Sequence, residues 1–284
     1  MDSIKENIER RFFDEICKKN GVVVQIGVRY SGKTLWFCSA LSYFIKNDCF
    51  ESYHLVLPSY RFQRDNTYKF LELLPKDKGD RITIYEDFGV EIVELLLKNR
   101  KKNGNTLFLI DDATNFNELF YTNENVKKLI TLARHLSIST WLVSHTLLKT
   151  LSPQIRANIS YIVLHRVSNM NLLSSFHEEI LSMFIDKKDF LDFLKRELRA
   201  NDFYALVIDK DRSQISHINS MEWDRIKKER LYIQNINNNN ITKKNNESNR
   251  KENVKANTTQ NTIKTKQQPP CKFPKIKSFK VVIR

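Results

Sequence analysis

Residues 27–34 read Gly27-Val28-Arg29-Tyr30-Ser31-Gly32-Lys33-Thr34, and this stretch decides the fold. It fits G-x-x-x-x-G-K-[ST], the pattern of a phosphate-binding loop (P-loop, or Walker A). The apolar run GVVVQI precedes it at 21–26, and apolar residues at helical spacing follow it over 35–47. Such a succession predicts a strand, a P-loop and a helix.

The residue types in this loop suit a magnesium-bound nucleoside triphosphate. Gly27 and Gly32 allow the backbone to wrap a phosphate with its N–H groups exposed. The helix that begins near Lys33 directs the positive end of its dipole at the same anion. The Lys33 ammonium reaches the β- and γ-phosphates, and the Thr34 hydroxyl ligates Mg²⁺. The predicted nucleotide-binding residues are Gly27, Val28, Arg29, Tyr30, Ser31, Gly32, Lys33, Thr34 and Leu35.

Short apolar strands alternate with helical patterns outward from the loop. We expect strands at 21–26, 53–57, 82–85, 107–110, 140–143, 161–164 and 203–208, and helices at 35–47, 60–74, 90–97, 125–135, 155–159 and within 176–199. Strands buried on both faces and separated by helices form parallel sheets. The fold class is therefore predicted as α/β, a P-loop NTPase with a mainly parallel central sheet flanked by helices.

Two adjacent acids end the apolar strand LFLI. Asp111 and Asp112 follow Ile110, at the carboxyl end of a strand, where α/β sheets place their ligands. One acid at this point (Walker B) holds the Mg²⁺ of a P-loop NTPase, and a second orients and deprotonates the attacking water. We assign Asp111 to the metal and Asp112 to the water, with Glu118 as the alternative to Asp112.

Composition excludes several classes of protein. The chain has 284 residues, 41% hydrophobic and 28% charged, with a formal net charge of +14. No apolar run is long enough to span a bilayer, and residues 1–16 lack the uncharged core of a signal peptide. The four cysteines show neither CxxC pairing nor metal-ligand spacing, so we expect a reduced compartment. An enzyme, a nucleic-acid binder, or both remain.

The positive charge is concentrated at the carboxyl end of the chain. Residues 231–284 contain 12 Lys and Arg and 2 Asp and Glu, and they are rich in Asn and poor in apolar residues. Such a segment cannot bury enough surface to offset its ordering entropy. We predict an N-terminal helix at 1–19, a P-loop ATPase domain at 20–230 and a disordered basic tail at 231–284. The tail either contacts phosphates without reading sequence or is a low-complexity extension with no task.

A P-loop by itself does not identify the reaction. The N-K-x-D-like segment typical of guanine specificity is absent from the sequence. A small-molecule kinase would carry arginines clustered on a lid. The stretch KDFLDFLKRELR contains two, but an amphipathic helix surface explains it equally well.

Three segments resemble the poxvirus-type genome-packaging ATPases of large DNA viruses, virophages and Maverick/Polinton-like elements, a branch of the FtsK–HerA superfamily. These segments are GVRYSGKT, LFLIDDATNF and ARHLSISTWLVSHTLLKTLSPQIRANISYIVLHR. The resemblance covers roughly residues 20–210. Its more specific elements are the pair Arg134-His135 and the run Ile155-Arg156-x-Asn158.

The resemblance implies a RecA-like ATPase whose identical subunits form a ring. The ring would hydrolyse ATP with Mg²⁺ and pump double-stranded DNA into a viral capsid, with capsid or portal-vertex proteins as further partners. The location implied is the host cytoplasm (viral factory) and the virion. The same residues fit a cellular or conjugative DNA translocase or helicase. A non-hydrolysing, nucleotide-dependent DNA-anchoring protein is the alternative from a different class.

The resemblance also suggests catalytic residues beyond Lys33 and Asp112. An arginine from a neighbouring subunit stabilises transition-state charge in such ATPases, and Arg134 and Arg156 are the candidates, with Arg156 preferred. The family often ends the strand after the acids with Gln, whereas this chain has Ser144-His145. We assign the γ-phosphate sensor to Ser144, with His145 as the alternative.

Two basic stretches are candidate DNA contacts, and each is also consistent with an ordinary solvated surface. The first, just before the acidic strand, contains Lys98, Arg100, Lys101 and Lys102. The second interleaves aromatic and basic side chains at Tyr60, Arg61, Arg64 and Lys69. Both could follow a phosphate backbone without reading bases.

Overall fold

The structure, a computed structural model, describes residues 11–60, 68–72, 74–99, 104–146, 150–167, 170–182, 185–200, 205–212 and 214–218. Within the predicted N-terminal helix, residues 11–18 are helical. The predicted basic tail at 231–284 and the domain boundary at residue 230 lie outside the described residues, so the domain division stays a prediction.

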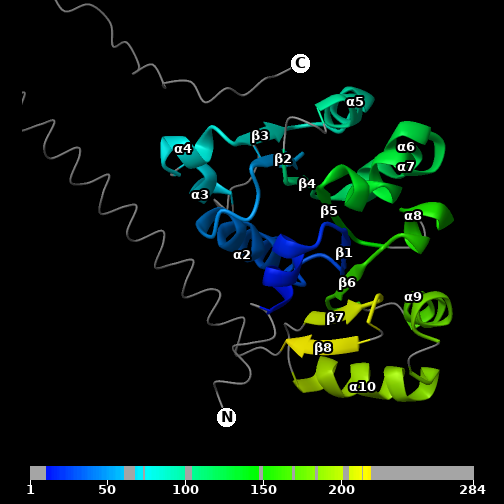
Figure 1. The fold of residues 1–284 in the computed structure, drawn as a ribbon. Helices are drawn as coiled ribbons and strands as arrows, with labels where there is room; N and C mark the ends of the chain where they lie inside the picture. Colours follow the sequence, from blue (N-terminus) through cyan, green and yellow to red (C-terminus); the bar gives the residue numbers. More distant parts are fainter. Residues whose placement is uncertain are drawn as a thin grey trace, which may run out of the picture.

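Eight strands form one sheet in the order β3-β2-β4-β5-β1-β6-β7-β8. Their bounds are β1 Val22–Ile26, β2 Ser52–Val56, β3 Ile82–Tyr85, β4 Thr106–Ile110, β5 Ile138–Ser144, β6 Tyr161–Leu164, β7 Ala205–Asp209 and β8 Gln214–Ile218. Strands β3 through β6 in this order pair in parallel, and β7 and β8 add an antiparallel hairpin at one edge (Figure 1). The mainly parallel α/β sheet predicted from the sequence is confirmed.

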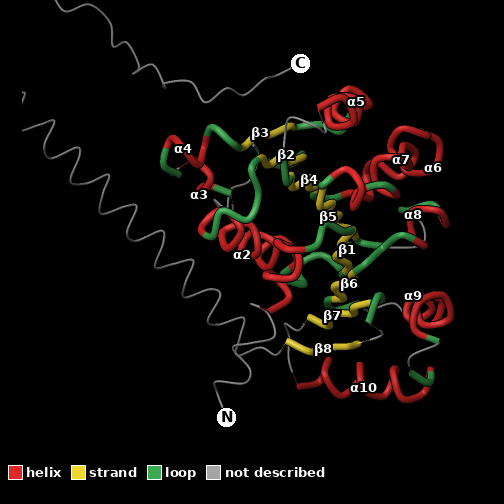
Figure 2. Tube along the Cα trace, viewed as in Figure 1, coloured by secondary structure: helices red, strands yellow, loops and turns green. Residues whose placement is uncertain are grey.

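Helices cover both faces of the sheet (Figure 2). Their bounds are α2 Lys33–Lys46, α3 Lys69–Glu72, α4 Lys76–Gly79, α5 Val90–Asn99, α6 Asn117–Thr122, α7 Glu124–Thr131, α8 Pro153–Ala157, α9 Met170–Phe176 and α10 Lys187–Ala200. Helices α2, α3 and α4 lie on one face, and α5 through α9 lie on the other (Figure 1). Among the described residues, no helix has both the length and the hydrophobicity to span a membrane.

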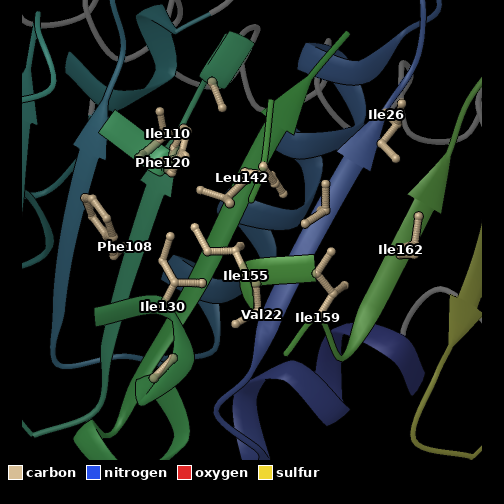
Figure 3. Packing of buried hydrophobic residues seen from close by; sticks show 14 of the residues in the cluster. Val22, Ile26, Phe108, Ile110, Phe120, Ile130, Leu142, Ile155, Ile159 and Ile162 are labelled. Carbon is tan, nitrogen blue, oxygen red and sulfur yellow. The ribbon is translucent and has the colours of Figure 1, made fainter. Parts of the chain in front are cut away.

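The two faces of the sheet bury separate hydrophobic clusters. Along β1, Val22, Val24 and Ile26 belong to the cluster under α5, α7 and α8, and Figure 3 shows Val22 and Ile26 among the packed side chains of that face. Val23 points the other way, into a cluster that includes Trp36 of α2. This alternation follows from the period of two in a strand. It explains why the inner strands read as continuous apolar runs.

Helical residues 11–18 belong to the α2 face. The ring of Phe12 stacks on Trp36 with centroids 5.7 Å apart, and Phe13 packs against the same indole at 5.4 Å. A disulfide joins Cys17 to Cys49, in the connection between α2 and β2. The lack of CxxC spacing between these two cysteines therefore did not exclude a disulfide, and the reduced compartment stays a prediction. Their separation of 32 residues is not one of the short spacings that the sequence analysis considered.

Three further features differ from the predicted elements. Strand β8 was not predicted: within the described part of the chain it pairs only with β7, and its sequence QISHI lacks the continuous apolar run of a strand buried on both faces. The helix predicted at 125–135 ends at Thr131 and gives way to a 3₁₀ turn at Ala133–Leu136. Of the helix predicted at 60–74, the described part is helical only over Lys69–Glu72.

Candidate nucleotide-binding site

The sheet order brings the predicted site residues to one edge. Strand β5 lies between β1 and β4, and all three are parallel. Their carboxyl ends therefore meet at the same edge: the P-loop follows β1, the acids follow β4, and Ser144-His145 end β5 between them. Sequence reasoning predicted the ligand edge, but not that β5 would separate the two halves of the site.

The backbone of the P-loop is fixed at both sides. The Gly27 N–H donates to the Ser144 carbonyl at 3.3 Å, and the Val28 N–H donates to the Arg166 carbonyl at 3.0 Å. A Cβ at Gly27 would lie 2.7 Å from Cβ of His165, so only glycine fits there. Gly32, with φ 87°, has the left-handed conformation in which glycine is favoured. Both glycines of the motif are thus required by the backbone.

The Lys33 side chain turns back into the loop. Its ammonium donates to the carbonyls of Gly27 at 2.7 Å and Val28 at 2.9 Å, and it lies 3.2 Å from Nδ1 of His145. The Lys33 side chain is buried. The P-loop backbone therefore closes around the Lys33 ammonium, the group that the motif predicts to bind the phosphates.

Burial also changes the acidity of this lysine. Desolvation lowers the pKa of Lys33 to about 8, although the negative charges of Asp111 and Asp112 act in the opposite direction. The charge of Lys33, in the P-loop, thus interacts with the charges of the two acids after β4. The ammonium is thus still charged at neutral pH, and it is close to its titration range.

The loop has features that fit a phosphate group. The Ser31 hydroxyl is buried, and it has no hydrogen-bond partner among the described residues, so it is available to a ligand. Helix α2 has 14 residues and begins at Lys33, with Thr34 half-buried in its first turn. The described residues hold no group of three or more His, Cys, Asp or Glu side chains arranged to bind a metal. Mg²⁺ at nucleotide sites takes only one or two carboxylates beside phosphates and waters, so Thr34 and Asp111 fit that role.

Both oxygens of the predicted metal ligand Asp111 accept hydrogen bonds from the protein. The Tyr68 hydroxyl donates to Oδ2, and the Asp112 N–H donates to Oδ1 at 3.0 Å. Burial raises the pKa of Asp111, and the Tyr68 hydroxyl and the Asp112 N–H partly offset the increase because they stabilise the carboxylate.

Asp112 lies next to the site in a left-handed conformation, with φ 54°. Its Oδ2 accepts from the Asn115 amide at 2.9 Å, and its Oδ1 lies 3.5 Å from Nε2 of His145. The alternative acid, Glu118, is exposed on α6. The contact with His145 favours Asp112 as the acid that acts on water.

Ser144 and His145 have different surroundings. The Ser144 hydroxyl is buried in a network with Thr114 Oγ1 at 3.0 Å, Thr150 Oγ1 at 3.0 Å and the Thr146 carbonyl at 2.6 Å. The His145 ring instead lies between Lys33 and Asp112. The surroundings of His145 therefore fit a γ-phosphate sensor better than those of Ser144, and the assignment of the sensor stays a prediction. The preference for Ser144 rested on its place at the end of the strand, which does not reveal where the hydroxyl points.

Neither candidate arginine lies at this edge. Arg134 precedes β5, where it pairs with Asp211 and donates to the Ser160 hydroxyl at 2.9 Å. It lines a cavity of about 330 Å³ at the amino edge of the sheet, together with Lys19 and Asn20. Its side chain is 55% exposed.

Arg156 is more deeply engaged within its own chain. Its guanidinium pairs with Glu179 and donates to the Leu151 carbonyl at 2.6 Å, and its side chain is only 14% exposed. An arginine that acts on a neighbouring subunit has to reach out of its own. The preference for Arg156 over Arg134 is thus not supported by its surroundings.

The candidate DNA contacts are only partly described. Lys98 and Lys69 are exposed, and Tyr60 donates from its hydroxyl to Glu72 at 3.2 Å. Arg61, Arg64 and residues 100–102 lie outside the described residues, so both stretches stay predictions.

Sequence analysis did not identify two residues that support the site. Tyr68 contacts Asp111 from the connection after β2. Gln25, fully buried in β1, donates to the Lys33 carbonyl at 2.9 Å and lies 2.8 Å from Nε2 of His165. A glutamine inside the run GVVVQI was the available signal, because a buried amide requires partners. Tyr68 gave no such signal.

Comparison with solved structures shows that the fold of this chain is a known one. No family profile and no curated protein matches the sequence. Among solved structures, the chain is similar to B204, the DNA-packaging ATPase from Sulfolobus Turreted Icosahedral Virus. The TM-score is 0.51 with 16% identity, over 69% of this chain and 96% of that chain.

Two further solved structures are similar at lower scores. They are the genome packaging NTPase B204 from Sulfolobus turreted icosahedral virus 2 in complex with AMPPCP (TM-score 0.48, 17% identity, 70% of this chain and 96% of that one) and the pCW3 conjugation coupling protein TcpA (0.40, 13%, 55% and 51%). The likeness to the first B204 structure shows that this chain has the α/β P-loop fold of a DNA-packaging ATPase. The resemblance predicted from the sequence is thereby confirmed at the level of the fold.

Proposed function

We propose that the protein is an ATPase that translocates double-stranded DNA, and that it packages a viral genome into a capsid. The observation that carries this proposal is the convergence of Lys33, Asp111 and Asp112 on one edge of a sheet with the B204 fold. Fold alone does not define a reaction. The charged side chains at this edge are those that hydrolysis of a triphosphate requires.

Each residue has a distinct task in the proposed reaction. Lys33 binds the β- and γ-phosphates, and Thr34 and Asp111 hold Mg²⁺. The metal, when bound, neutralises charge that develops on the phosphate oxygens. Asp112 orients the attacking water and accepts its proton. His145, between Lys33 and Asp112, takes the place of the glutamine sensor and contacts the γ-phosphate.

A second part of the proposal concerns assembly and location. Identical subunits form a ring, and an arginine from each subunit completes the site of its neighbour. Capsid or portal-vertex proteins anchor the ring, and the motor works in the host cytoplasm (viral factory) or within the virion. The fold shared with a DNA-packaging ATPase supports this arrangement.

The test is ATP turnover measured with and without double-stranded DNA. Duplex DNA should stimulate turnover, and Lys33→Ala should abolish both basal and stimulated activity. Lys46→Ala is the matched control, because Lys46 is exposed at the other end of the same helix. Nucleotide binding without turnover would instead identify a non-hydrolysing DNA-anchoring protein. DNA-independent turnover that consumes a small phosphate acceptor would identify a kinase.

Packaging itself needs a separate observation, since a cellular or conjugative translocase would give the same turnover. A capsid gene beside this one, and DNA protected from nuclease inside capsids only when Lys33 is intact, would support packaging. DNA movement between cells or along a chromosome would contradict it.

We further propose that the basic tail at 231–284 binds the DNA backbone. Its 12 Lys and Arg against 2 Asp and Glu make its contribution dependent on salt. A chain ending at residue 230 should bind duplex DNA more weakly, with a shallower dependence of affinity on salt concentration. Unchanged affinity and slope would show that the tail has no role in DNA binding.

A further inference from the structure

Tyr68 is a buried side chain whose polar atom points at the predicted metal ligand. It lies just before α3, at the end of the connection from β2. Only 2% of its surface is exposed, and its hydroxyl donates a hydrogen bond to Oδ2 of Asp111, which is 7% exposed. Two buried groups from segments 43 residues apart thus meet in one polar contact.

The surroundings of Tyr68 fix the position of its hydroxyl. The ring packs against Phe37 of α2, with centroids 6.2 Å apart, and against Tyr60, with centroids 6.3 Å apart. The hydroxyl therefore cannot leave Asp111 unless the ring leaves this aromatic cluster.

The carboxylate of Asp111 is held from two directions. The Asp112 N–H approaches Oδ1, and the Tyr68 hydroxyl approaches Oδ2. A carboxylate that accepts one hydrogen bond on each oxygen cannot rotate freely, and each oxygen keeps further acceptor capacity for a metal or its water. Partners of this kind orient metal ligands in general, and their loss costs about 10- to 100-fold in metal affinity or activity.

We propose that Tyr68 is a positioning residue for magnesium: its hydroxyl sets the orientation in which Asp111 meets the nucleotide-bound metal. This inference rests on the proposed function in one respect, the assignment of Asp111 to Mg²⁺. It makes Tyr68, just before α3, part of the nucleotide site.

The test is the Mg²⁺ dependence of nucleotide binding by Tyr68→Phe, which keeps the ring and removes only the hydroxyl. Calorimetry measures the affinity for a non-hydrolysable ATP analogue at a series of Mg²⁺ concentrations. The readout is the Mg²⁺ concentration at which half of the metal-dependent increase in affinity is reached. We expect this concentration to rise about 10-fold in Tyr68→Phe, with little change in affinity for the analogue without metal.

Tyr53→Phe is the matched control. The Tyr53 hydroxyl is equally buried and donates to the Phe44 carbonyl at 3.0 Å, but Tyr53 lies near the amino end of β2, away from Asp111. Tyr53→Phe should lower thermal stability and leave the Mg²⁺ dependence as in the wild type. Equal Mg²⁺ dependence in Tyr68→Phe and the wild type would overturn the proposal, as would an equal shift in both variants.

A double-mutant comparison gives a second measurement. In an Asp111→Asn background, removing the Tyr68 hydroxyl should add no further loss of Mg²⁺ affinity. A further loss of the same size would show that Tyr68 acts through the general packing of the site, against the proposal. A wild type that binds Mg²⁺ with the analogue but never hydrolyses ATP would contradict the proposed function and leave the result for Tyr68 intact.

Discussion

The Lys33 ammonium lies 3.2 Å from Nδ1 of His145, although 112 residues separate the two along the chain. On its other side the His145 ring faces Asp112, with Nε2 3.5 Å from Oδ1. Nδ1 also lies 3.1 Å from the Gly27 carbonyl oxygen, so the tautomer of the ring decides whether Nδ1 accepts from Lys33 or donates to that carbonyl. One ring thus connects the P-loop cation to the acid proposed to act on water.

This relationship predicts a loss of catalysis when His145 is removed. His145→Ala should lower kcat on the order of 100-fold and change the KM for ATP little, because the role we propose for the ring is at the γ-phosphate and not on the whole nucleotide. His145→Gln should keep most of the activity, since an amide also offers one donor and one acceptor. Steady-state kinetics at saturating Mg²⁺ measure both.

Ser144→Ala is the control for that experiment. It removes a buried hydroxyl from the network with Thr114 and Thr150, so it should lower the free energy of unfolding by about 1–3 kcal/mol and leave kcat nearly unchanged. A larger kcat defect in Ser144→Ala than in His145→Ala would return the sensor role to Ser144.

Lys33 should take up a proton when nucleotide binds at alkaline pH. Burial lowers the pKa of Lys33 to about 8, and the oxygens of a bound triphosphate favour the charged ammonium and raise it again. Binding near pH 9 should therefore absorb a proton, whereas binding near pH 7.5 should absorb little through this group. Calorimetry in two buffers of different ionisation enthalpy counts the protons.

The same lowered pKa affects the stability of the free protein. Between about pH 8 and the ordinary lysine value, the unfolded chain binds a proton at this position and the folded chain does not, so the free energy of unfolding rises with pH across that window. Lys33→Arg, whose charge persists at all these pH values, should show neither effect. Equal proton uptake at both pH values would contradict the assignment.

The sequence was sufficient for the strands and the P-loop for a physical reason. Strands buried on both faces need continuous apolar runs, so β6 at Tyr161–Leu164 could be located to the residue, and β4 at Thr106–Ile110 to within one residue. The two glycines, Lys33 and the paired acids carry their chemistry in their identity and spacing. An edge strand such as β8 has no such requirement, and it was missed.

What the sequence could not reveal depends on contacts between distant segments. The order β4-β5-β1 is a property of the assembled sheet, and it brings His145, at the end of β5, to Lys33. Nothing in the sequence distinguishes Tyr68 from other aromatic residues, and its role depends on the contact of its hydroxyl with Asp111 in the folded chain. The partner of Cys17 was hidden for the same reason, because 32 residues separate it from Cys49.

The disulfide between Cys17 and Cys49 should contribute measurably to stability. A disulfide that closes a loop of this length lowers the conformational entropy of the unfolded chain, which stabilises the folded state by about 3–4 kcal/mol. The bond also holds helical residues 11–18 against the α2 face. The protein with both cysteines changed to Ser should therefore melt at a lower temperature than the oxidised wild type. Peptide mapping without reductant identifies the bond, and a melting temperature unaffected by reductant would contradict its stabilising role.

We expect Arg134, and not Arg156, to be the arginine that acts on a neighbouring subunit. The Arg134 side chain is 55% exposed and that of Arg156 only 14%, so Arg134 can more easily leave its own subunit. Arg134→Ala should lower ATP turnover by at least about 100-fold. Arg156→Ala should chiefly destabilise the fold, because it leaves Glu179 and the Leu151 carbonyl without the guanidinium.

Mixed assemblies separate these two roles. Arg134→Ala subunits keep an intact P-loop, and Lys33→Ala subunits keep the arginine. Where the two are neighbours, one active site is complete, so mixing two inactive proteins should restore part of the turnover. Arg156→Ala should gain nothing from the same mixture, because a fold defect is confined to its own chain. Recovery with Arg156→Ala and none with Arg134→Ala would instead identify Arg156 as the residue that crosses the subunit boundary.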